Sequence, residues 1–361
     1  MLKSQKVVLV SDTVSGGGAE KVLMTFLSMF PKSDLYTLYI FPEARKRINK
    51  QFPKVKINTS LFQFLINKNK VSKYISIIKL FSWIYWECLD LKKYDLIISS
   101  SHSYMAKNVK RGVGSKHLSY IHTPPRFLYD EYCEINLAKK IPLGWLRLID
   151  KNGSKRPDVI VVNSENVKKR VKKYYNRDAK VVYPPVETDF ENKRDIKKNY
   201  YICLSRLVKQ KGIDLAVDFC TKYNLPLYVV GDGDEYYFLK KRAGESVKFI
   251  RKCNDRKKMQ LLAQAKALIY PSIEEDFGIV PVEAMSVGTP VIGFASGGVK
   301  ETIENGVTGV LFYKHSMKSL KEAIKKFDSL IWDKDICCQK AKKFSEDVFV
   351  DKIKEIIDKE L

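Results

Sequence analysis

The stretch that most limits the fold is residues 267–298, where two short apolar runs enclose a loop and a helix-forming segment. Residues Ala267–Tyr270 and Pro290–Phe294 are too short for helices and end at proline or glycine turns, so we expect buried parallel strands. Between them, Val282 opens a short helix that Gly288-Thr289-Pro290 stops. In an open α/β sheet the loop between such a strand and helix lies at the carboxyl ends of the strands, where ligands bind.

Two carboxylates, Glu275 and Glu283, lie on either side of this turn with seven residues between them. Free backbone N–H groups at a helix start attract anions, and carboxylates accept hydrogen bonds from sugar hydroxyls. Anion and polyol recognition on one loop predicts a sugar nucleotide as the ligand. The alternative is a solvated acidic loop that the helix dipole stabilises, which applies most readily to Glu274 and Asp276.

A second signal is His122, which follows the apolar run 117–121 and precedes Thr123-Pro124-Pro125-Arg126. The prolines stiffen this loop and restrict where the preceding histidine points. A histidine at the carboxyl end of a strand, beside a rigid loop that carries Arg126, favours a functional role over a structural one. His102 follows another expected strand, 96–100, and is a weaker candidate for the same edge of the sheet.

Three further segments have the composition of phosphate-binding loops. Arg206 and Lys211 are five residues apart in a strand-to-helix loop and can converge on one pyrophosphate, the guanidinium as a fork and the ammonium as a point charge. Glycine turns at 16–18 and 231–233 each follow an expected strand and let the backbone approach a ligand closely. The first is not Gly-x-Gly-x-x-Gly followed by a distant acid, so we expect no dinucleotide cofactor.

Length and composition favour two folded domains without a membrane span. A chain of 361 residues is long for one core, and 45% hydrophobic and 12% aromatic residues argue against disorder. No apolar run reaches the roughly 18 residues of a spanning helix, and no signal peptide precedes the strand expected at 7–10. The seven scattered cysteines lack zinc spacing, which favours reduced thiols in a cytosol.

The charge is uneven along the chain. Residues 1–190 hold 34 Lys and Arg against 16 Asp and Glu, whereas residues 191–361 hold 31 against 25. This excess predicts an anionic partner for the first half, unless it only reflects a lysine-rich genome. We find no nucleic-acid recognition motif, so an anionic membrane surface or a lipid-pyrophosphate acceptor fits better. Residues 61–89 could form an amphipathic helix that lies in a membrane interface, or one that packs on its own domain.

The run Glu275-Asp-Phe-Gly-Ile-Val-Pro-Val-Glu283 fits the pattern Glu-x-Phe-Gly-x4-Glu without a gap. It resembles the signature of the retaining glycosyltransferases of family 4, most closely the bacterial mannosyl- and rhamnosyltransferases of O-antigen and capsule assembly. The loop at 122–126 and the Arg206-x4-Lys211-Gly motif are similar to those of the same family, so the resemblance covers nearly the whole chain. Arg251 departs from it, because the family usually has glycine there, and this leaves base recognition open.

The resemblance implies an α/β chain with the GT-B fold, in which two Rossmann-like domains with parallel sheets face each other across a cleft. The N-terminal, acceptor-side domain would comprise residues 1–186, with a C-terminal helix at about 340–361 packing back on it. Residues 187–199 would be the linker, and residues 200–339 the sugar-nucleotide-binding domain.

The resemblance also implies roles for individual residues. The implied catalytic residues are His122, Arg206, Lys211 and Glu275. The implied donor-binding residues are Gly16, Gly17, Gly18, Gly231, Gly233, Phe277, Gly278, Ile279, Val280 and Glu283. Weaker candidates for the acceptor side are His102, Arg126 and Asp130. In this assignment the cationic pair contacts the donor diphosphate, Glu275 holds sugar hydroxyls and Glu283 binds the ribose. Asp232-Gly-Asp234 looks like a metal-binding Asp-x-Asp motif, but its place in a glycine turn favours a structural role.

We therefore expect a retaining, metal-independent hexosyltransferase that needs no cofactor. Its donor would be GDP-mannose or another nucleotide sugar, and its acceptor a lipid-linked saccharide. It would act in the cytoplasm, on the inner face of the cytoplasmic membrane. Alternatives are a UDP-sugar donor, an epimerase or phosphorylase of the same fold, or a non-enzymatic protein that binds membranes or nucleic acid through its basic charge.

Overall fold

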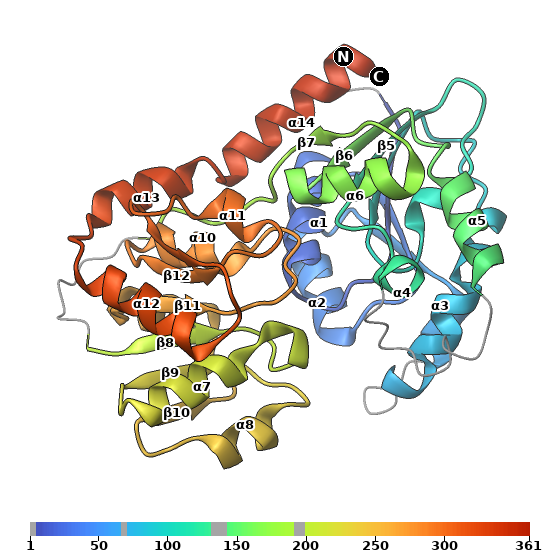
Figure 1. Cartoon of the computed structure of the whole chain (residues 1–361). Helices are drawn as coiled ribbons and strands as arrows, with labels where there is room; N and C mark the ends of the chain where they lie inside the picture. The colour runs from blue at the N-terminus through green and yellow to red at the C-terminus, as the bar shows by residue number, and fades with distance from the viewer. Residues whose placement is uncertain (1–4, 66–70, 131–142, 191–198) are drawn as a thin grey trace. The chain divides into compact units, whose positions relative to one another are not determined.

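The computed structural model describes residues 5–65, 71–130, 143–190 and 199–361 (Figure 1). It divides into two compact units, Met1–Pro185 with Asp347–Leu361, and Val186–Glu346. Each unit is built around its own parallel sheet, so the expected fold class of two Rossmann-like domains is confirmed.

The first unit contains a seven-stranded parallel sheet in the order β3-β2-β1-β4-β5-β6-β7. Its strands are β1 (Val7–Ser11), β2 (Asp34–Thr37), β3 (Lys56–Thr59), β4 (Leu96–Ser101), β5 (Lys116–Ile121), β6 (Val159–Val162) and β7 (Lys180–Val181). Its α-helices are α1 (Gly18–Met29), α2 (Pro42–Gln51), α3 (Val71–Cys88), α4 (Arg126–Tyr129), α5 (Gly144–Gly153), α6 (Glu165–Tyr175) and α14 (Glu346–Glu360). Two 3-10 helices, η1 (Leu61–Leu65) and η2 (Ala106–Asn108), complete the described elements.

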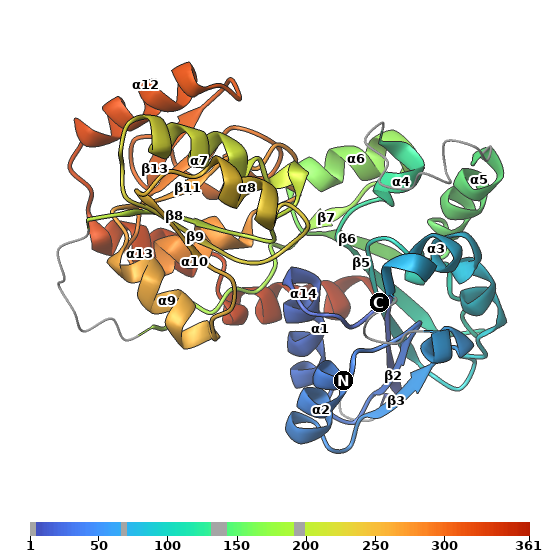
Figure 2. The same ribbon diagram turned by 90° about the horizontal axis from the view of Figure 1, so that it is seen from below.

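Both faces of this sheet are covered, as a parallel sheet requires. Side chains alternate along β1, so that Val7 and Leu9 join a core with α1, α2 and α14, whereas Val8 and Val10 join a core with α3, α5 and η2. Figure 2 shows α1 and α2 on one face of the sheet and α3 and α5 on the other.

The second unit contains a six-stranded parallel sheet in the order β10-β9-β8-β11-β12-β13. Its strands are β8 (Tyr201–Leu204), β9 (Leu227–Val230), β10 (Val247–Ile250), β11 (Ala267–Tyr270), β12 (Val291–Phe294) and β13 (Gly309–Phe312). Its helices are η3 (Lys209–Lys211), α7 (Ile213–Lys222), α8 (Tyr236–Arg242), α9 (Asp255–Gln264), α10 (Ile279–Ser286), α11 (Val299–Thr302), α12 (Met317–Asp328) and α13 (Lys334–Lys342). Helices α7, α8 and α12 cover one face, and α9, α10 and α13 the other (Figure 2).

Helix α10 begins at Ile279, three residues before the start that the sequence suggests. Pro281 does not prevent this earlier start, because proline is tolerated in the first turn of a helix, where its missing N–H is not needed. Residues 281–286 are all buried, because the helix packs between the sheet and its neighbouring helices. This short buried helix carries Glu283 and presents its N-terminus at the end of β11.

Helix α3 holds part of the segment predicted to be amphipathic; residues 66–70 of that segment lie outside the described residues. Ile78 and Trp86 are buried in the core of the first unit, so these two residues pack on their own domain, the second of the two expected arrangements. Ile77, Phe81 and Ile84 are instead 43%, 46% and 42% exposed. Among the described residues, no helix is long and apolar enough to cross a membrane.

Candidate functional site

Glu275 is the centre of the polar site in the second unit. One of its oxygens, Oε2, accepts hydrogen bonds from Lys211 Nζ at 2.6 Å, Tyr270 OH at 2.5 Å and Ser272 Oγ at 3.2 Å. Lys211 comes from the loop after β8 and Glu275 from the loop after β11, and these strands are neighbours in the sheet. The fold therefore places both loops at the same edge, the carboxyl ends of the strands.

The surroundings keep Glu275 ionised. Burial alone would raise the pKa of its carboxyl, but the charge of Lys211 and the hydrogen bonds from Lys211, Tyr270 and Ser272 outweigh it, and the pKa is lowered. Burial and the nearby carboxylate raise the pKa of Tyr270, so its hydroxyl keeps its proton and remains a donor. Tyr270 and Ser272 were missed by sequence reasoning because they are common residues at a strand end, without a motif of their own.

Arg206 does not share this contact. Its side chain is exposed, and within the described residues its guanidinium makes no ion pair or hydrogen bond. The structure thus places Arg206 and Lys211 in the same loop, and of the two only Lys211 has a carboxylate partner among the described residues. A planar guanidinium without a protein partner can bind an oxyanion bidentately.

The glycine turn after β9 is shaped by its packing on the Arg206 loop. Gly231 and Gly233 have φ values of 138° and 159°, and a Cβ at either would collide with the carbonyl oxygen of Ser205 or Leu207. Only glycine allows the two loops to approach this closely. These glycines therefore hold the backbone on both sides of Arg206, whether or not they also contact a ligand.

The acidic loop leads into α10 without a side-chain cap. Gly278 is the N-cap residue, in a left-handed conformation with φ 95°, and the first N–H groups of the helix follow at Ile279 and Val280. Such N–H groups have no partner inside the helix and attract anions. The side chain of Phe277 is buried against Phe344, with ring centroids 5.4 Å apart, so only its backbone is available to a ligand.

Glu283 has a partner that the sequence did not reveal. Its Oε1 accepts a hydrogen bond from Lys258 Nζ at 3.1 Å, and the same ammonium lies 3.1 Å from Asp255 Oδ1. Burial would lower the pKa of Lys258, but Glu283 and Asp255 raise it. Lys258 lies on α9, in a chain so rich in lysine that nothing in the sequence marks it.

Arg251, which replaces the family's usual glycine, binds Asp232. Its guanidinium donates to both carboxylate oxygens of Asp232 at 2.9 Å and lies 4.4 Å from the ring centroid of Tyr236. Asp232 Oδ1 also accepts from the backbone N–H of Gly233 at 2.9 Å. In this structure Asp232 therefore joins the loops after β9 and β10, which agrees with a structural role for the Asp-Gly-Asp turn.

In the first unit, His122 lies at the end of β5 and is buried. Its Nε2 is 2.9 Å from Ser100 Oγ, and its ring centroid is 5.0 Å from that of Tyr120 and 6.2 Å from that of His102. Burial, with a smaller effect of His102, lowers the pKa of His122 to about 3. The imidazole is therefore neutral at physiological pH, and it can exchange hydrogen bonds but carries no charge.

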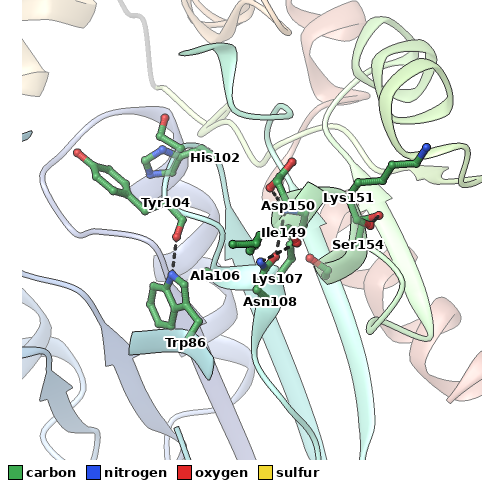
Figure 3. Close-up of polar contacts among 12 residues, drawn as sticks. Trp86, His102, Tyr104, Ala106, Lys107, Asn108, Ile149, Asp150, Lys151 and Ser154 are labelled. Carbon is green, nitrogen blue, oxygen red and sulfur yellow. Dashed lines mark hydrogen bonds and ion pairs between the residues drawn. The ribbon is translucent and has the colours of Figure 1, made fainter. Parts of the chain in front are cut away.

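Asp12, another residue that the sequence did not single out, organises the loop that holds His102. Its fully buried carboxylate accepts four backbone N–H groups, from His102 at 2.6 Å, Ser103 at 2.7 Å, Tyr104 at 2.8 Å and Ala106 at 2.7 Å. Trp86 donates its indole N–H to the carbonyl of Tyr104 on the same loop (Figure 3). His102 Nδ1 lies 3.8 Å from Asp12, and its side chain is 25% exposed.

The glycine turn at 16–18 is held by Glu20. Gly16 and Gly17 have φ values of 98° and 93°, which L side chains rarely adopt, and Gly18 starts α1. The N–H of Gly16 donates to Glu20 Oε2 at 2.5 Å, and the other oxygen of Glu20 pairs with Arg47. At least one N–H of this turn is therefore bound within the protein.

Two of the three weaker acceptor-side candidates, Arg126 and Asp130, form an ion pair with each other. Asp130 accepts from Arg126 at 3.1 Å and, through both oxygens, from Arg170 at 3.0 Å. Arg170 lies on α6, so Asp130 joins this helix to α4. The contacts describe a structural role, and the acceptor-side role of Arg126 and Asp130 stays a prediction.

A second group of contacts in the first unit is built on a fully buried ion pair. It joins Lys107 and Asp150, whose side chains are 1% and 0% exposed. Lys107 Nζ also donates to Asn108 Oδ1 at 3.3 Å, and Tyr129 OH donates to Asp150 Oδ2 at 3.0 Å. Figure 3 shows Lys107 on η2 pointing toward Asp150 on α5. The pair fixes η2 and α5 beside the loop that carries His102.

Two family models match successive parts of the chain. Residues 16–190 match the model described as Glycosyltransferase Family 4, and residues 186–346 match the model described as Glycosyl transferases group 1. Each boundary falls close to the division between the two units.

Similar proteins include two named mannosyltransferases. The human alpha-1,3/1,6-mannosyltransferase ALG2 is 30% identical over 252 residues, which are 59% of this chain and 59% of that protein. The O-antigen chain mannosyltransferase RfbU of Salmonella typhimurium is 31% identical over 199 residues, which are 52% of this chain and 55% of that protein. This chain thus spans less than two thirds of the length of either relative.

A similar solved structure is that of Anabaena Alr3699/HepE in complex with UDP-glucose. It has a TM-score of 0.72 at 18% identity and covers 98% of this chain and 99% of its own. At this identity the likeness supports the fold alone. Together with the two family models and the two parallel sheets, it confirms the resemblance, and the chain belongs to glycosyltransferase family 4, with the GT-B fold.

Proposed function

We propose that this chain is a retaining mannosyltransferase that transfers mannose from GDP-mannose to a lipid-linked saccharide in the assembly of a bacterial surface polysaccharide such as O-antigen or capsule. The observation that carries the proposal is the preformed contact between Lys211 and Glu275 at the carboxyl ends of β8 and β11. The names of ALG2 and RfbU favour mannose, and that of RfbU favours an O-antigen.

The charges of the second unit fit a sugar diphosphate donor. Arg206 has no protein partner within the described part of the chain, and the first N–H groups of α10 face the same edge of the sheet. Both would bind the donor phosphates, and Lys211 would add its charge while it holds Glu275 ionised. Glu275 would accept hydrogen bonds from the hexose hydroxyls. Such preorganised charge stabilises a departing diphosphate without reorganisation at the moment of reaction.

We propose that the reaction needs neither a metal nor a cofactor, because side chains and helix N–H groups provide the positive charge. The sequence offers no convincing nucleophile, so substitution on the front face of the sugar, with the leaving phosphate accepting the acceptor's proton, accounts best for retention. The roles of His122 and of the glycines at 16–18 stay predictions.

A transfer assay tests the proposal directly. The purified chain, supplied with GDP-mannose and a membrane extract containing lipid-linked saccharides, should release GDP, extend the lipid-linked product, and do both equally well in EDTA. UDP-glucose and UDP-galactose should be used at least tenfold less efficiently. Preference for a UDP-sugar would replace the proposed donor, which the UDP-glucose complex of the HepE structure makes the second candidate. Loss of activity in EDTA with recovery in manganese would contradict the metal-free reaction.

The ion pair of Lys258 with Glu283 leads to a prediction about the ribose. If Lys258 orients Glu283 toward a ribose hydroxyl, Lys258→Met should weaken GDP binding about tenfold, because the buried carboxylate of Glu283 loses its ion pair with Lys258. Calorimetry with GDP, 2′-deoxy-GDP and 3′-deoxy-GDP tests this. The affinity lost when the ribose hydroxyl is removed from GDP should be smaller in Lys258→Met than in the wild type. Lys257→Met, at an exposed position, should behave as the wild type. An unchanged loss of affinity in Lys258→Met would show that Lys258 is only structural.

We also propose that the chain works on the inner face of the cytoplasmic membrane, through an apolar surface on the first unit. This α3 surface consists of Leu61, Phe64, Ile77, Phe81, Ile84, Trp145 and Leu148, each more than a third exposed. Trp83 of α3 and Trp145 of α5 contact each other edge to face, with ring centroids 6.4 Å apart, and so join the two helices. The basic excess of the first half of the chain would complement anionic lipids.

Binding to vesicles of phosphatidylglycerol and phosphatidylcholine should therefore weaken at least tenfold in Phe81→Ser/Ile84→Ser, measured by co-flotation. The loss follows from the apolar area that the two side chains no longer insert. The matched control is Tyr237→Ser/Phe238→Ser, which removes exposed aromatic side chains from the second unit. Equal vesicle binding by both double variants would remove the α3 surface from the proposal.

A further inference from the structure

A hollow to which no role has been assigned lies in the first unit, at the edge of the sheet opposite to His122. It is a cavity of about 650 Å³ lined by Gln5, Lys6, Val7, Met29, Phe30, Pro31, Lys32, Ser33, Asp34, Lys93, Tyr94 and Lys354. Its walls come from the start of β1, the end of α1, the start of β2, the loop before β4, and α14. These are the amino ends of the strands, whereas His122 and His102 follow their carboxyl ends, so the cavity is separate from the residues assigned to transfer.

The cavity combines an apolar wall with a cationic rim. Val7, Met29, Phe30 and Pro31 provide the apolar part, and four lysines stand at its margin against a single carboxylate, Asp34. That carboxylate already has partners, because Tyr94 OH donates to it and Lys93 Nζ lies 3.9 Å away. Within the described residues, Lys6, Lys32 and Lys354 form no side-chain ion pair. Among the residues that the structure describes, the positive charge of these three lysines is therefore not balanced by an ion pair.

A buried hydroxyl gives the second observation. Ser33 is 3% exposed and lines the cavity, and its Oγ has no hydrogen-bond partner among the described residues. A buried hydroxyl without a partner is unfavourable, because it has lost its hydrogen bonds to water without gaining one in the protein. Close to the lysines, this hydroxyl can donate to an anionic oxygen or accept from a protonated one.

We propose that this cavity binds a phosphate monoester that carries an apolar group. The phosphate would lie among Lys32, Lys354 and Ser33 Oγ, and the apolar group would pack on Phe30 and Met29. Lysine binds phosphate as a point charge, and ligand cavities of 300–1,000 Å³ are typically apolar with a few polar groups that fix orientation. This site does not depend on the proposed transfer reaction, because none of its residues belongs to the donor or acceptor assignments.

Calorimetric titration with n-hexyl phosphate tests the site. The wild-type chain should bind one equivalent saturably, inorganic phosphate should bind at least tenfold more weakly, and hexanol should not bind measurably. Lys32→Glu/Lys354→Glu should weaken hexyl phosphate binding at least tenfold, whereas the control Lys46→Glu/Lys50→Glu, on exposed positions of α2, should not change it. No saturable binding by the wild type, or equal loss in both double variants, would overturn the proposal.

Ser33→Ala separates a ligand contact from a structural role. It should weaken hexyl phosphate binding severalfold yet leave the melting temperature of the free chain unchanged or raised, because it removes an unpaired buried hydroxyl. Unchanged affinity in this variant would show that Ser33 does not contact the ligand, and it would contradict the proposed site. Co-flotation with phosphatidic acid vesicles distinguishes the source of the phosphate: vesicle binding that depends on Lys32 and Lys354 indicates a lipid, and binding of hexyl phosphate alone indicates a soluble metabolite.

Discussion

Replacing Glu275 by alanine is expected to lower turnover with GDP-mannose by about two to three orders of magnitude, the usual effect of losing one preorganised polar group at a reacting centre. The substitution removes the acceptor proposed for the hexose hydroxyls and leaves Lys211 Nζ and Tyr270 OH without their shared partner. Steady-state kinetics should show the loss mainly in kcat, since the diphosphate contacts that we propose for Arg206 and the α10 N-terminus would remain.

Glu274→Ala is the matched control, because it removes the neighbouring carboxylate and leaves the contacts of Glu275 with Lys211 and Tyr270 in place, and it should keep most of the activity. Circular dichroism must show that both variants keep the wild-type fold. Wild-type turnover in a folded Glu275→Ala enzyme would remove this residue from the mechanism.

The lowered pKa of Glu275 gives the sign of a pH effect. Because the folded-state pKa lies below the ordinary value of 4.5, the ion pair contributes stability above that pH, and this contribution is lost as the pH falls through the folded-state pKa. Wild-type and Glu275→Gln chains should therefore differ in stability at neutral pH and converge in acid.

Replacing Lys107 by methionine is expected to destabilise the first unit by about 3–5 kcal/mol, because it leaves the carboxylate of Asp150 buried without its counter-charge. Urea unfolding followed by tryptophan fluorescence would measure the change. Lys110→Met should cost less than about 1 kcal/mol, since Lys110 pairs with Glu87 while its own side chain is 59% exposed.

The double variant Lys107→Met/Asp150→Leu separates the two possible causes. If the single variant suffers from an uncompensated charge, removing Asp150 as well should restore much of the stability. If packing of the long lysine stem dominates, the double variant should be no more stable than the single one. Equal stability of wild type and Lys107→Met would contradict the buried pair itself.

The parts of this protein that could be predicted from its sequence are those with local signals. Short apolar runs that end at glycine or proline marked the strands, and the spacing of Glu275 and Glu283 marked the strand-to-helix turn. Spacing within one loop also identified Arg206 and Lys211, although it could not show that only Lys211 contacts a carboxylate.

The contacts that could not be predicted join residues that are far apart in the sequence. Lys258 is 25 positions from Glu283, Lys107 is 43 from Asp150, and Asp12 is 90 from the N–H of His102. Each partner comes from a separate element that the sheet order brings together, so no local pattern reports the contact. With 65 Lys and Arg in the chain, an individual lysine carries little information until its neighbours are known.

We propose that the loop of Arg206 and Lys211 and the loop of Glu275 together bind a sugar diphosphate. Calorimetric titration of the wild-type chain and of Lys211→Ala with GDP-mannose, GDP and mannose tests it most directly. We expect saturable binding of GDP-mannose and GDP by the wild type and no measurable binding of mannose. Folded Lys211→Ala should bind GDP-mannose at least tenfold more weakly. Equal affinity of the two proteins for GDP-mannose, or no binding of any nucleotide sugar by the wild type, would contradict it.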